Sequence, residues 1–150
     1  MARPDPNAPR EAIRLDGGAT VLVADADEHL RDIYATLLGH HGYRPVEAAD
    51  GLAAVTLARE LRPDALVLDL EIPGPGGVEV MRLLRDDPAT AEIPTVLLSV
   101  RSEVGVRLQA RRVGGLGFLE KPFAPGQLLA EVRRALATAP APLALHASGA

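Results

Sequence analysis

The central part of the chain alternates short, almost continuously apolar runs with longer stretches in which apolar residues recur at helical spacing. Runs such as TVLVAD and DALVLD are rich in Val, Leu and Ala, as expected of strands buried on both faces. The runs predict five strands, at 20–25, 43–48, 64–69, 94–99 and 116–120. Because helical stretches alternate with these strands, the pattern predicts an α/β fold: a doubly wound, five-stranded parallel sheet with helices on both faces.

The starts of the predicted helices carry residues that suit the first turn of a helix. The five helices are predicted to begin near Asp27, Asp50, Gly77, Ser102 and Ala124. Asp27, Asp50 and Ser102 are predicted N-caps, because a short side-chain oxygen can accept hydrogen bonds from the unpaired amides of the first turn. At Asp27 this capping role is favoured over a role as a metal ligand.

The first predicted helix carries an apolar stripe formed by Leu30, Ile33, Leu37 and Leu38. The spacing of these residues predicts that they form the packed face of the helix. Gly42 follows the stripe and predicts a left-handed residue at the end of the helix.

The two ends of the chain lack this periodicity. Residues 1–18 are rich in Pro, Ala, Arg and Gly, and residues 139–150 have a similarly simple composition. We therefore expect a flexible N-terminal arm (1–18), one folded domain (19–138) and a flexible C-terminal tail (139–150).

Composition narrows the class of protein. The chain has 150 residues, no cysteine and a formal net charge of −4, which predicts a cytoplasmic globular protein without disulfides. No apolar run reaches the roughly 18 residues of a membrane-spanning helix, and prolines interrupt the N-terminus where a signal peptide is apolar. The mild acidity argues against nonspecific nucleic-acid binding. Among the basic residues, fifteen are arginine and one is lysine, Lys121.

Polar residues stand at or just beyond the ends of four predicted strands: Asp25, Asp69, Ser99 and Lys121. Parallel strands present their carboxyl ends at one edge of the sheet, where open α/β folds bind ligands. We therefore expect these four side chains to converge. Two carboxylates form a hard-oxygen site suited to Mg²⁺, and a hydroxyl and an ammonium can hold a transferring phosphoryl group.

The segments VLVADAD, LVLDLEIPGPGG, VLLS and FLEKPF resemble, in order and spacing, the landmarks of the response-regulator receiver domain of two-component signalling. The resemblance covers roughly residues 19–138 and implies the flavodoxin-like, CheY-like fold. It implies that Asp69 accepts a phosphoryl group from a histidine kinase or phosphotransfer protein, with Ser99 and Lys121 binding the phosphoryl group.

The resemblance also implies the remaining parts of the site. Mg²⁺ would be held by Asp25, Asp69 and the backbone carbonyl of Glu71. The peptide bond between Lys121 and Pro122 would be cis. Ser99 and Phe118 would be the switch residues that respond to phosphorylation.

The sequence departs from the family pattern at several positions. The family usually has two adjacent acids after the first strand, and here Asp25 is followed by Ala26. Phe118 stands where tyrosine is frequent in the family. Because phenylalanine has no hydroxyl, this side chain cannot donate a hydrogen bond. Glu71 and Arg101 lie at variable positions at the mouth of the site, which their opposite charges could bridge.

The leading hypothesis is a single-domain response regulator that signals through a protein partner and is not an enzyme. Its output face would comprise the fourth predicted helix, the fifth strand and the fifth helix, where Leu116 is expected to be exposed and a homodimer could form. No contact with nucleic acid or a membrane is expected.

Two alternatives remain from the sequence. A degenerate receiver would bind partners without being phosphorylated, which Ala26 motivates. A phosphatase of the haloacid dehalogenase type is suggested by the Asp-Leu-Glu segment at 69–71, although Glu71 is the wrong acid for that motif. Phosphorylation would distinguish the receiver from its degenerate form, and hydrolysis of phosphate esters would identify the phosphatase.

Overall fold

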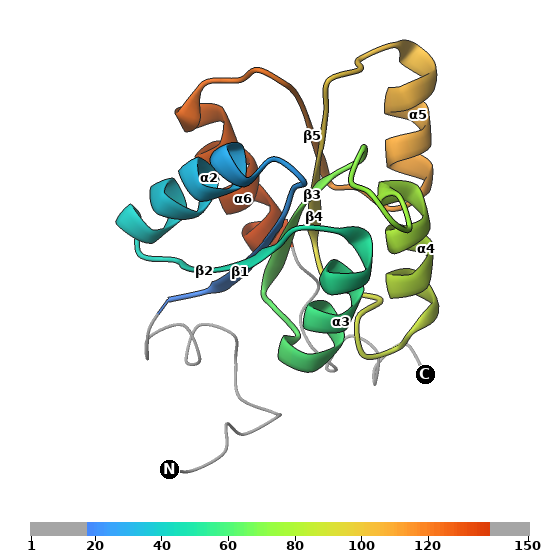
Figure 1. Ribbon diagram of the computed structural model, residues 1–150, viewed down its shortest axis with the longest axis horizontal. Coiled ribbons are helices and arrows are strands. Elements are labelled where there is room, and N and C mark those ends of the chain that lie inside the picture. The colour runs from blue at the N-terminus through green and yellow to red at the C-terminus, as the bar shows by residue number, and fades with distance from the viewer. Residues whose placement is uncertain (1–17, 139–150) are drawn as a thin grey trace.

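A computed structural model describes residues 18–138 of the chain as a single five-stranded parallel sheet with five helices (Figure 1). The strands are β1 (Thr20–Ala24), β2 (Arg44–Ala48), β3 (Ala65–Asp69), β4 (Thr95–Ser99) and β5 (Gly117–Glu120). The helices are α2 (Glu28–His40), α3 (Gly51–Leu61), α4 (Gly77–Asp86), α5 (Val104–Arg112) and α6 (Pro125–Thr138). The predicted tail at 139–150, and the predicted arm at 1–18 apart from Gly18, lie outside the described residues.

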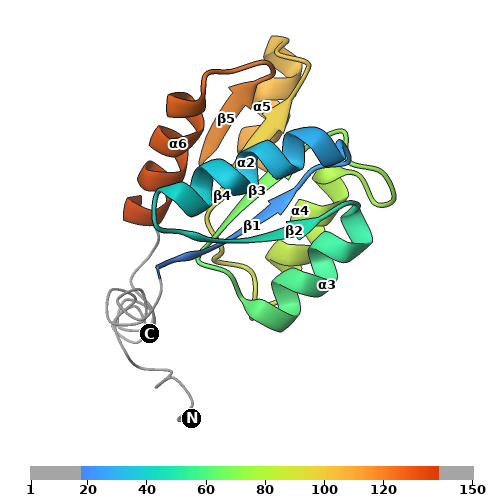
Figure 2. The same ribbon diagram turned by 60° about the vertical axis from the view of Figure 1, so that its left-hand side comes forward.

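The strand order is β2-β1-β3-β4-β5, and every neighbouring pair is parallel. Helices α2 and α6 cover one face of the sheet, and α3, α4 and α5 cover the other (Figures 1 and 2). The predicted doubly wound fold is therefore confirmed. Its order places β1, β3 and β4 side by side in the middle of the sheet, so residues at their carboxyl ends become neighbours.

The core consists of two apolar layers separated by the sheet. All five residues of β3 and all five of β4 are buried, which explains why these strands read as continuous apolar runs rather than alternating ones. Side chains such as Leu66 and Val67 alternate between the layers, Leu66 on the side of α3 and α4 and Val67 on the side of α2 and α6. The strand ends are thereby held firmly at the edge of the sheet.

Two of the three predicted N-caps are confirmed. Asp27 accepts hydrogen bonds from the amides of His29 and Leu30, and Asp50 accepts one of 2.8 Å from Ala53. The prediction for Ser102 is wrong: α5 begins one residue later than Ser102 could cap, with Glu103 at the N-cap and no capping side-chain hydrogen bond. The Ser102 backbone carbonyl instead accepts a hydrogen bond from the Arg107 side chain.

The predicted stripe of α2 needs one correction. The helix buries Tyr34, Ala35 and Leu38, whereas Ile33 is 45% exposed. The buried face runs through Tyr34 and Leu38, which are four residues apart, and Ile33 lies about 100° around the helix from Tyr34. The left-handed residue after the helix is confirmed, since Gly42 has φ +89°.

Within residues 18–138, none of the helices combines the length and the apolar character that crossing a bilayer would require.

The caps allow a matched test of local stability. We predict that Asp50→Ala lowers the free energy of unfolding by about 1 kcal/mol, because it leaves an amide of the first turn of α3 without its acceptor. Ser102→Ala should change the free energy of unfolding by less than about 0.5 kcal/mol, because its side chain caps nothing. Urea denaturation of both variants checks the difference, and an equal loss in the two would contradict the assigned caps.

Candidate functional site

Asp25, Asp69, Ser99 and Lys121 meet at the carboxyl edge of the sheet. Asp25 directly follows β1 and its amide bonds the Ala48 carbonyl of β2, while Asp69 and Ser99 are the last residues of β3 and β4. The Lys121 amide donates to the Ser99 carbonyl over 2.8 Å, which fixes the start of the loop after β5. The predicted cis peptide between Lys121 and Pro122 is present.

The Lys121 ammonium joins the two carboxylates. Its Nζ lies 2.6 Å from Asp25 Oδ2 and 3.4 Å from Asp69 Oδ2. Burial by itself would lower the pKa of Lys121, but the hydrogen bond to Asp25 and the charge of Asp69 outweigh burial and raise the pKa above its usual value. Lys121 therefore stays cationic, and one compact charge balances part of the negative charge of two buried carboxylates.

The Asp69 side chain retains acceptor capacity although it is almost completely buried. The residue is 5% exposed, and its Oδ1 accepts a hydrogen bond of 2.9 Å from the Glu71 amide. Burial raises the pKa of Asp69, the Glu71 amide and Lys121 act in the opposite direction, and the charges of Asp25 and Glu71 add to the rise. A carboxylate has about four lone-pair positions, so Asp69 can still accept from a ligand.

Both oxygens of the Asp25 carboxylate accept hydrogen bonds. Its Oδ1 accepts a hydrogen bond from the Asp27 amide and its Oδ2 one from Lys121. Ala26 lies between Asp25 and Asp27 in the sequence, and its side chain offers no ligand for a metal ion. Within residues 18–138 there is no cluster of three or more His, Cys, Asp or Glu side chains that could hold a metal ion. Asp25 and Asp69 nevertheless suit Mg²⁺, which commonly takes one or two carboxylates together with water.

Glu71 does not form the predicted bridge to Arg101. Its Oε2 accepts a hydrogen bond of 2.7 Å from the Ser99 hydroxyl, and its Oε1 accepts one of 3.0 Å from the Val100 amide. Arg101 instead pairs with Glu103 at 3.6 Å. The two Glu71 carboxylate oxygens thus bind a hydroxyl and an amide at the end of β4, and the Arg101 guanidinium has a different partner.

The predicted switch residues lie in different surroundings. Ser99 is fully buried at the edge of the sheet. Phe118 is half-buried on β5 and packs against the apolar layer beneath α5, and the Arg107 guanidinium lies 4.8 Å from the centre of its ring. This contact has the geometry of a cation–π interaction, so a rotation of Phe118 would break its contact with Arg107.

Sequence reasoning missed three residues beside the site: Arg31, Tyr34 and Phe123. Arg31 donates to the Asp25 backbone carbonyl and pairs with Glu47. Tyr34 and Phe123 stack with ring centres 5.3 Å apart, and burial raises the pKa of Tyr34. The spacing of Leu30, Tyr34 and Leu38 would have placed Tyr34 on the inner face of its helix.

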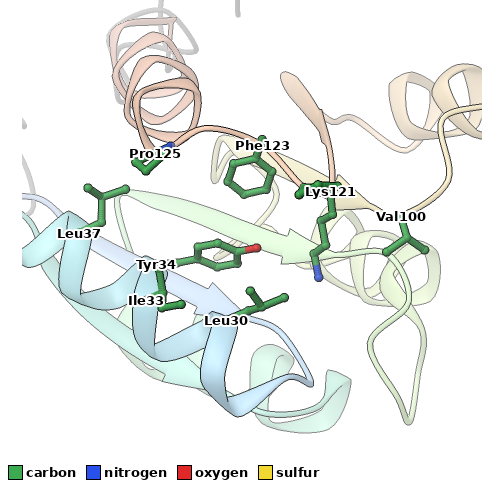
Figure 3. Close-up of a pocket in the computed structure, with 9 residues that line it drawn as sticks. Leu30, Ile33, Tyr34, Leu37, Val100, Lys121, Phe123 and Pro125 are labelled. Carbon is green, nitrogen blue, oxygen red and sulfur yellow. The ribbon is translucent and has the colours of Figure 1, made fainter.

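An apolar groove of about 500 Å³ lies next to the four site residues, between α2 and the loop that joins β5 to α6 (Figure 3). Figure 3 shows the Tyr34 ring extending across the groove, with its hydroxyl on the side of the Lys121 ammonium. The groove is lined by Leu30, Ile33, Tyr34, Leu37, Val100, Lys121, Pro122, Phe123 and Pro125. Lys121 thus belongs both to the charged site and to the groove.

The chain is similar in sequence to curated proteins. The phosphate regulon transcriptional regulatory protein PhoB of Pseudomonas aeruginosa is 32% identical over 119 residues, covering 79% of this chain and 52% of PhoB. The chain spans about half the length of the curated relatives it matches.

Solved structures are similar to this chain in fold and in sequence. Vibrio cholerae chemotaxis protein CheY4 has a TM-score of 0.74 and 29% identity, covering 78% of this chain and 98% of CheY4. The receiver domain of sensor histidine kinase PA1611 from Pseudomonas aeruginosa, which has a magnesium ion coordinated in its active site cleft, has a TM-score of 0.75 and 26% identity, covering 81% of this chain and 99% of that domain. Residues 21–133 match the response regulator receiver domain family, and the chain therefore belongs to that family.

Proposed function

We propose that this receiver is a phosphorylation switch: Asp69 accepts a phosphoryl group from a histidine kinase or phosphotransfer protein, and the switched receiver signals through a protein partner. The observation that carries the proposal is the Lys121 ammonium, 2.6 Å from Asp25 and 3.4 Å from Asp69. A largely buried cation beside a carboxylate that still has acceptor capacity can stabilise an added phosphoryl group. The family match removes the support for the haloacid dehalogenase alternative.

The transfer itself is a substitution at phosphorus. An Asp69 carboxylate oxygen forms the new O–P bond while the N–P bond of the donor phosphohistidine breaks, and the imidazole leaves. Lys121 balances negative charge on the phosphoryl oxygens, and Ser99 supplies a hydroxyl at the end of the adjacent strand. The amide of Glu71 holds Asp69 Oδ1 and so orients the attacking carboxylate.

The donor set at this edge fits Mg²⁺, because Asp25 and Asp69 supply hard carboxylate oxygens. We propose that these two side chains and the backbone carbonyl of Glu71 would hold the ion. When bound, Mg²⁺ supplies positive charge that lowers the cost of bringing an anionic phosphoryl donor to two carboxylates.

The apolar groove is the proposed docking site for the phosphodonor protein. A donor histidine must come within bonding distance of Asp69, so the donor must cover one rim of the site. The groove provides that rim with apolar surface, including Ile33, which is 45% exposed, and Val100, which is 61% exposed. An amphipathic helix that carries the donor histidine matches a groove of this kind.

The proposed output face comprises α5, β5 and α6. Leu116 is 47% exposed there, as expected from the sequence. A hollow of about 520 Å³ on this face is lined by Arg107, Ala110, Arg111, Gly115, Leu116, Gly117, Phe118 and Arg134. Because Phe118 lies in this hollow, a change in its rotamer would alter the surface that a partner or a second copy of the chain contacts. The proposed output is a protein contact, with no contact between residues 18–138 and nucleic acid or a membrane, and the proposed compartment is the cytoplasm.

A second candidate function is a receiver that binds partners without phosphorylation. The observation in its favour is Ala26, which removes one of the two acids usual at this position in the family. The two functions differ in whether Asp69 can be phosphorylated at any magnesium concentration.

We predict that Asp69 is the single site of phosphorylation. Treatment with acetyl phosphate or phosphoramidate and Mg²⁺ should label the wild type, and peptide mapping should place the acyl phosphate on Asp69. Asp69→Asn removes the nucleophilic carboxylate at nearly constant volume and should abolish labelling. Labelling of Asp69→Asn at the wild-type yield would show that another residue is the acceptor.

Ala26 predicts a high magnesium requirement. With one acid fewer, the site should bind Mg²⁺ about tenfold or more weakly than a site with both acids. Ala26→Asp should therefore lower the magnesium concentration for half-maximal phosphorylation, whereas Asp25→Ala should abolish the response. If the wild type and Ala26→Asp require equal magnesium, a group such as Asp27 already supplies the missing ligand.

Ile33 in the apolar groove and Leu116 on the output face are similarly exposed, so substitutions at these residues test the two surfaces separately. We predict that Ile33→Asp slows labelling by a histidine phosphotransfer protein that labels the wild type, because it places a charge in the groove, and leaves labelling by phosphoramidate unchanged. Leu116→Asp should leave both labelling reactions unchanged and weaken phosphorylation-dependent self-association or partner capture. Equal behaviour of the two variants in labelling and assembly assays would contradict the separation of the faces.

A further inference from the structure

The Glu71 carboxylate lies across the end of β4 and binds two donors there. Its oxygens accept from the Ser99 hydroxyl at 2.7 Å and from the Val100 amide at 3.0 Å. Ser99 is fully buried, whereas Glu71 is exposed. A solvent-facing acid from the loop after β3 therefore reaches across to a buried hydroxyl on the neighbouring strand.

The single proton of the Ser99 hydroxyl is already committed to this acid. A hydroxyl has one hydrogen to donate, and Ser99 donates it to Glu71. The Ser99 oxygen also accepts a hydrogen bond of 2.9 Å from the Arg101 amide. Ser99 can thus donate to a phosphoryl group on Asp69 only after Glu71 has released it.

The same two donors are suited to an anion. A hydroxyl and a backbone amide bind carboxylate oxygens and phosphoryl oxygens alike. A phosphoryl group adds roughly 1.5 to 2 negative charges, and Glu71 is only two residues from Asp69. Because the two anions repel each other and need the same hydrogen, they cannot both occupy the Ser99 hydroxyl.

The backbone of Glu71 does not have to move when its side chain leaves. Its amide donates to Asp69 Oδ1 at 2.9 Å, and the start of the loop is fixed by the hydrogen bond from the Leu70 amide to the Leu98 carbonyl. At the far end of the loop Gly77 packs closely, since a Cβ there would lie 2.6 Å from Leu70 Cα. The Glu71 side chain can therefore change conformation while the backbone of the loop stays in place.

We propose that the Glu71 carboxylate is an internal competitor of the phosphoryl group: it occupies the Ser99 hydroxyl and the Val100 amide before phosphorylation and is displaced by it. This inference rests on the proposed phosphorylation of Asp69. The competitor holds Ser99 in the unphosphorylated arrangement and raises the donor concentration needed to switch the protein. It is a positioning residue, since it acts through Ser99 and Val100.

The test is an equilibrium titration with beryllofluoride, a phosphoryl mimic, at saturating Mg²⁺, followed by the amide resonance of Val100. Glu71→Ala keeps the backbone carbonyl and amide and should bind beryllofluoride about tenfold more tightly than the wild type, because a charge-assisted hydrogen bond no longer has to be broken. The matched control is Glu103→Ala, which removes a nearby acid bonded to neither donor and should change the affinity by less than about twofold.

Two further readouts separate competition from other effects. Without beryllofluoride, the Val100 amide resonance should shift and its hydrogen exchange should accelerate in Glu71→Ala and not in Glu103→Ala. In a Ser99→Ala background, the gain from Glu71→Ala should shrink, because one of the two contested donors is absent. Urea denaturation confirms that each variant is folded.

The outcomes distinguish this inference from the proposed function on which it rests. Equal beryllofluoride affinity in the wild type and Glu71→Ala, or equal gains in Glu71→Ala and Glu103→Ala, would overturn the competitor while leaving phosphorylation of Asp69 intact. A protein that neither binds beryllofluoride nor is labelled by phosphoramidate, in any of these forms, would overturn the proposed function and the competitor with it.

Discussion

The site depends on one largely buried ammonium, that of Lys121, which lies between two carboxylates. Lys121 Nζ contacts Asp25 and Asp69, which lie at the ends of the neighbouring strands β1 and β3 and would repel each other without a cation between them. Two buried acids without a cation would be costly. Lysine suits this position because its charge is compact, whereas the planar guanidinium of the fifteen arginines requires a wider space. The loop after β5, the cis bond that follows Lys121 and the stacked pair Tyr34 and Phe123 all lie around this one charge.

The parallel sheet supplies the constraint that makes this contact possible. Buried central strands must end at a common edge, and the order β2-β1-β3-β4-β5 brings the ends of β1, β3 and β4 together. The charged edge meets an apolar groove beside α2, and the anionic Glu71 side chain lies across the end of β4. Donor access and internal competition are thus proposed for adjoining parts of this edge, since Val100 lines the groove and also donates to Glu71.

Much of this arrangement could be predicted from the sequence, because strand burial and helix capping are local properties. The apolar runs located all five strands to within about one residue at each end, and Asp27 and Asp50 marked their helices. Two of the three failures depend on contacts between distant segments, and the third is a shift of one residue in the start of α5. Glu103, and not Ser102, is the N-cap residue of α5. Ile33 is exposed because the buried face of α2 runs through Tyr34. Glu71 accepts a hydrogen bond from Ser99 and does not pair with Arg101. Nothing in a one-dimensional pattern states which of two polar partners a long acidic side chain will reach.

The central claim is that the single lysine links the carboxylates of the site to the phosphoryl group. The most direct measurement is the ¹⁵Nζ resonance of lysine-labelled protein, which is assigned at once because the chain has one lysine. The account predicts that this resonance shifts when phosphoramidate phosphorylates the wild type and stays unchanged when Asp69→Asn receives the same treatment. An unchanged Lys121 resonance in protein that carries a stoichiometric acyl phosphate would contradict the account.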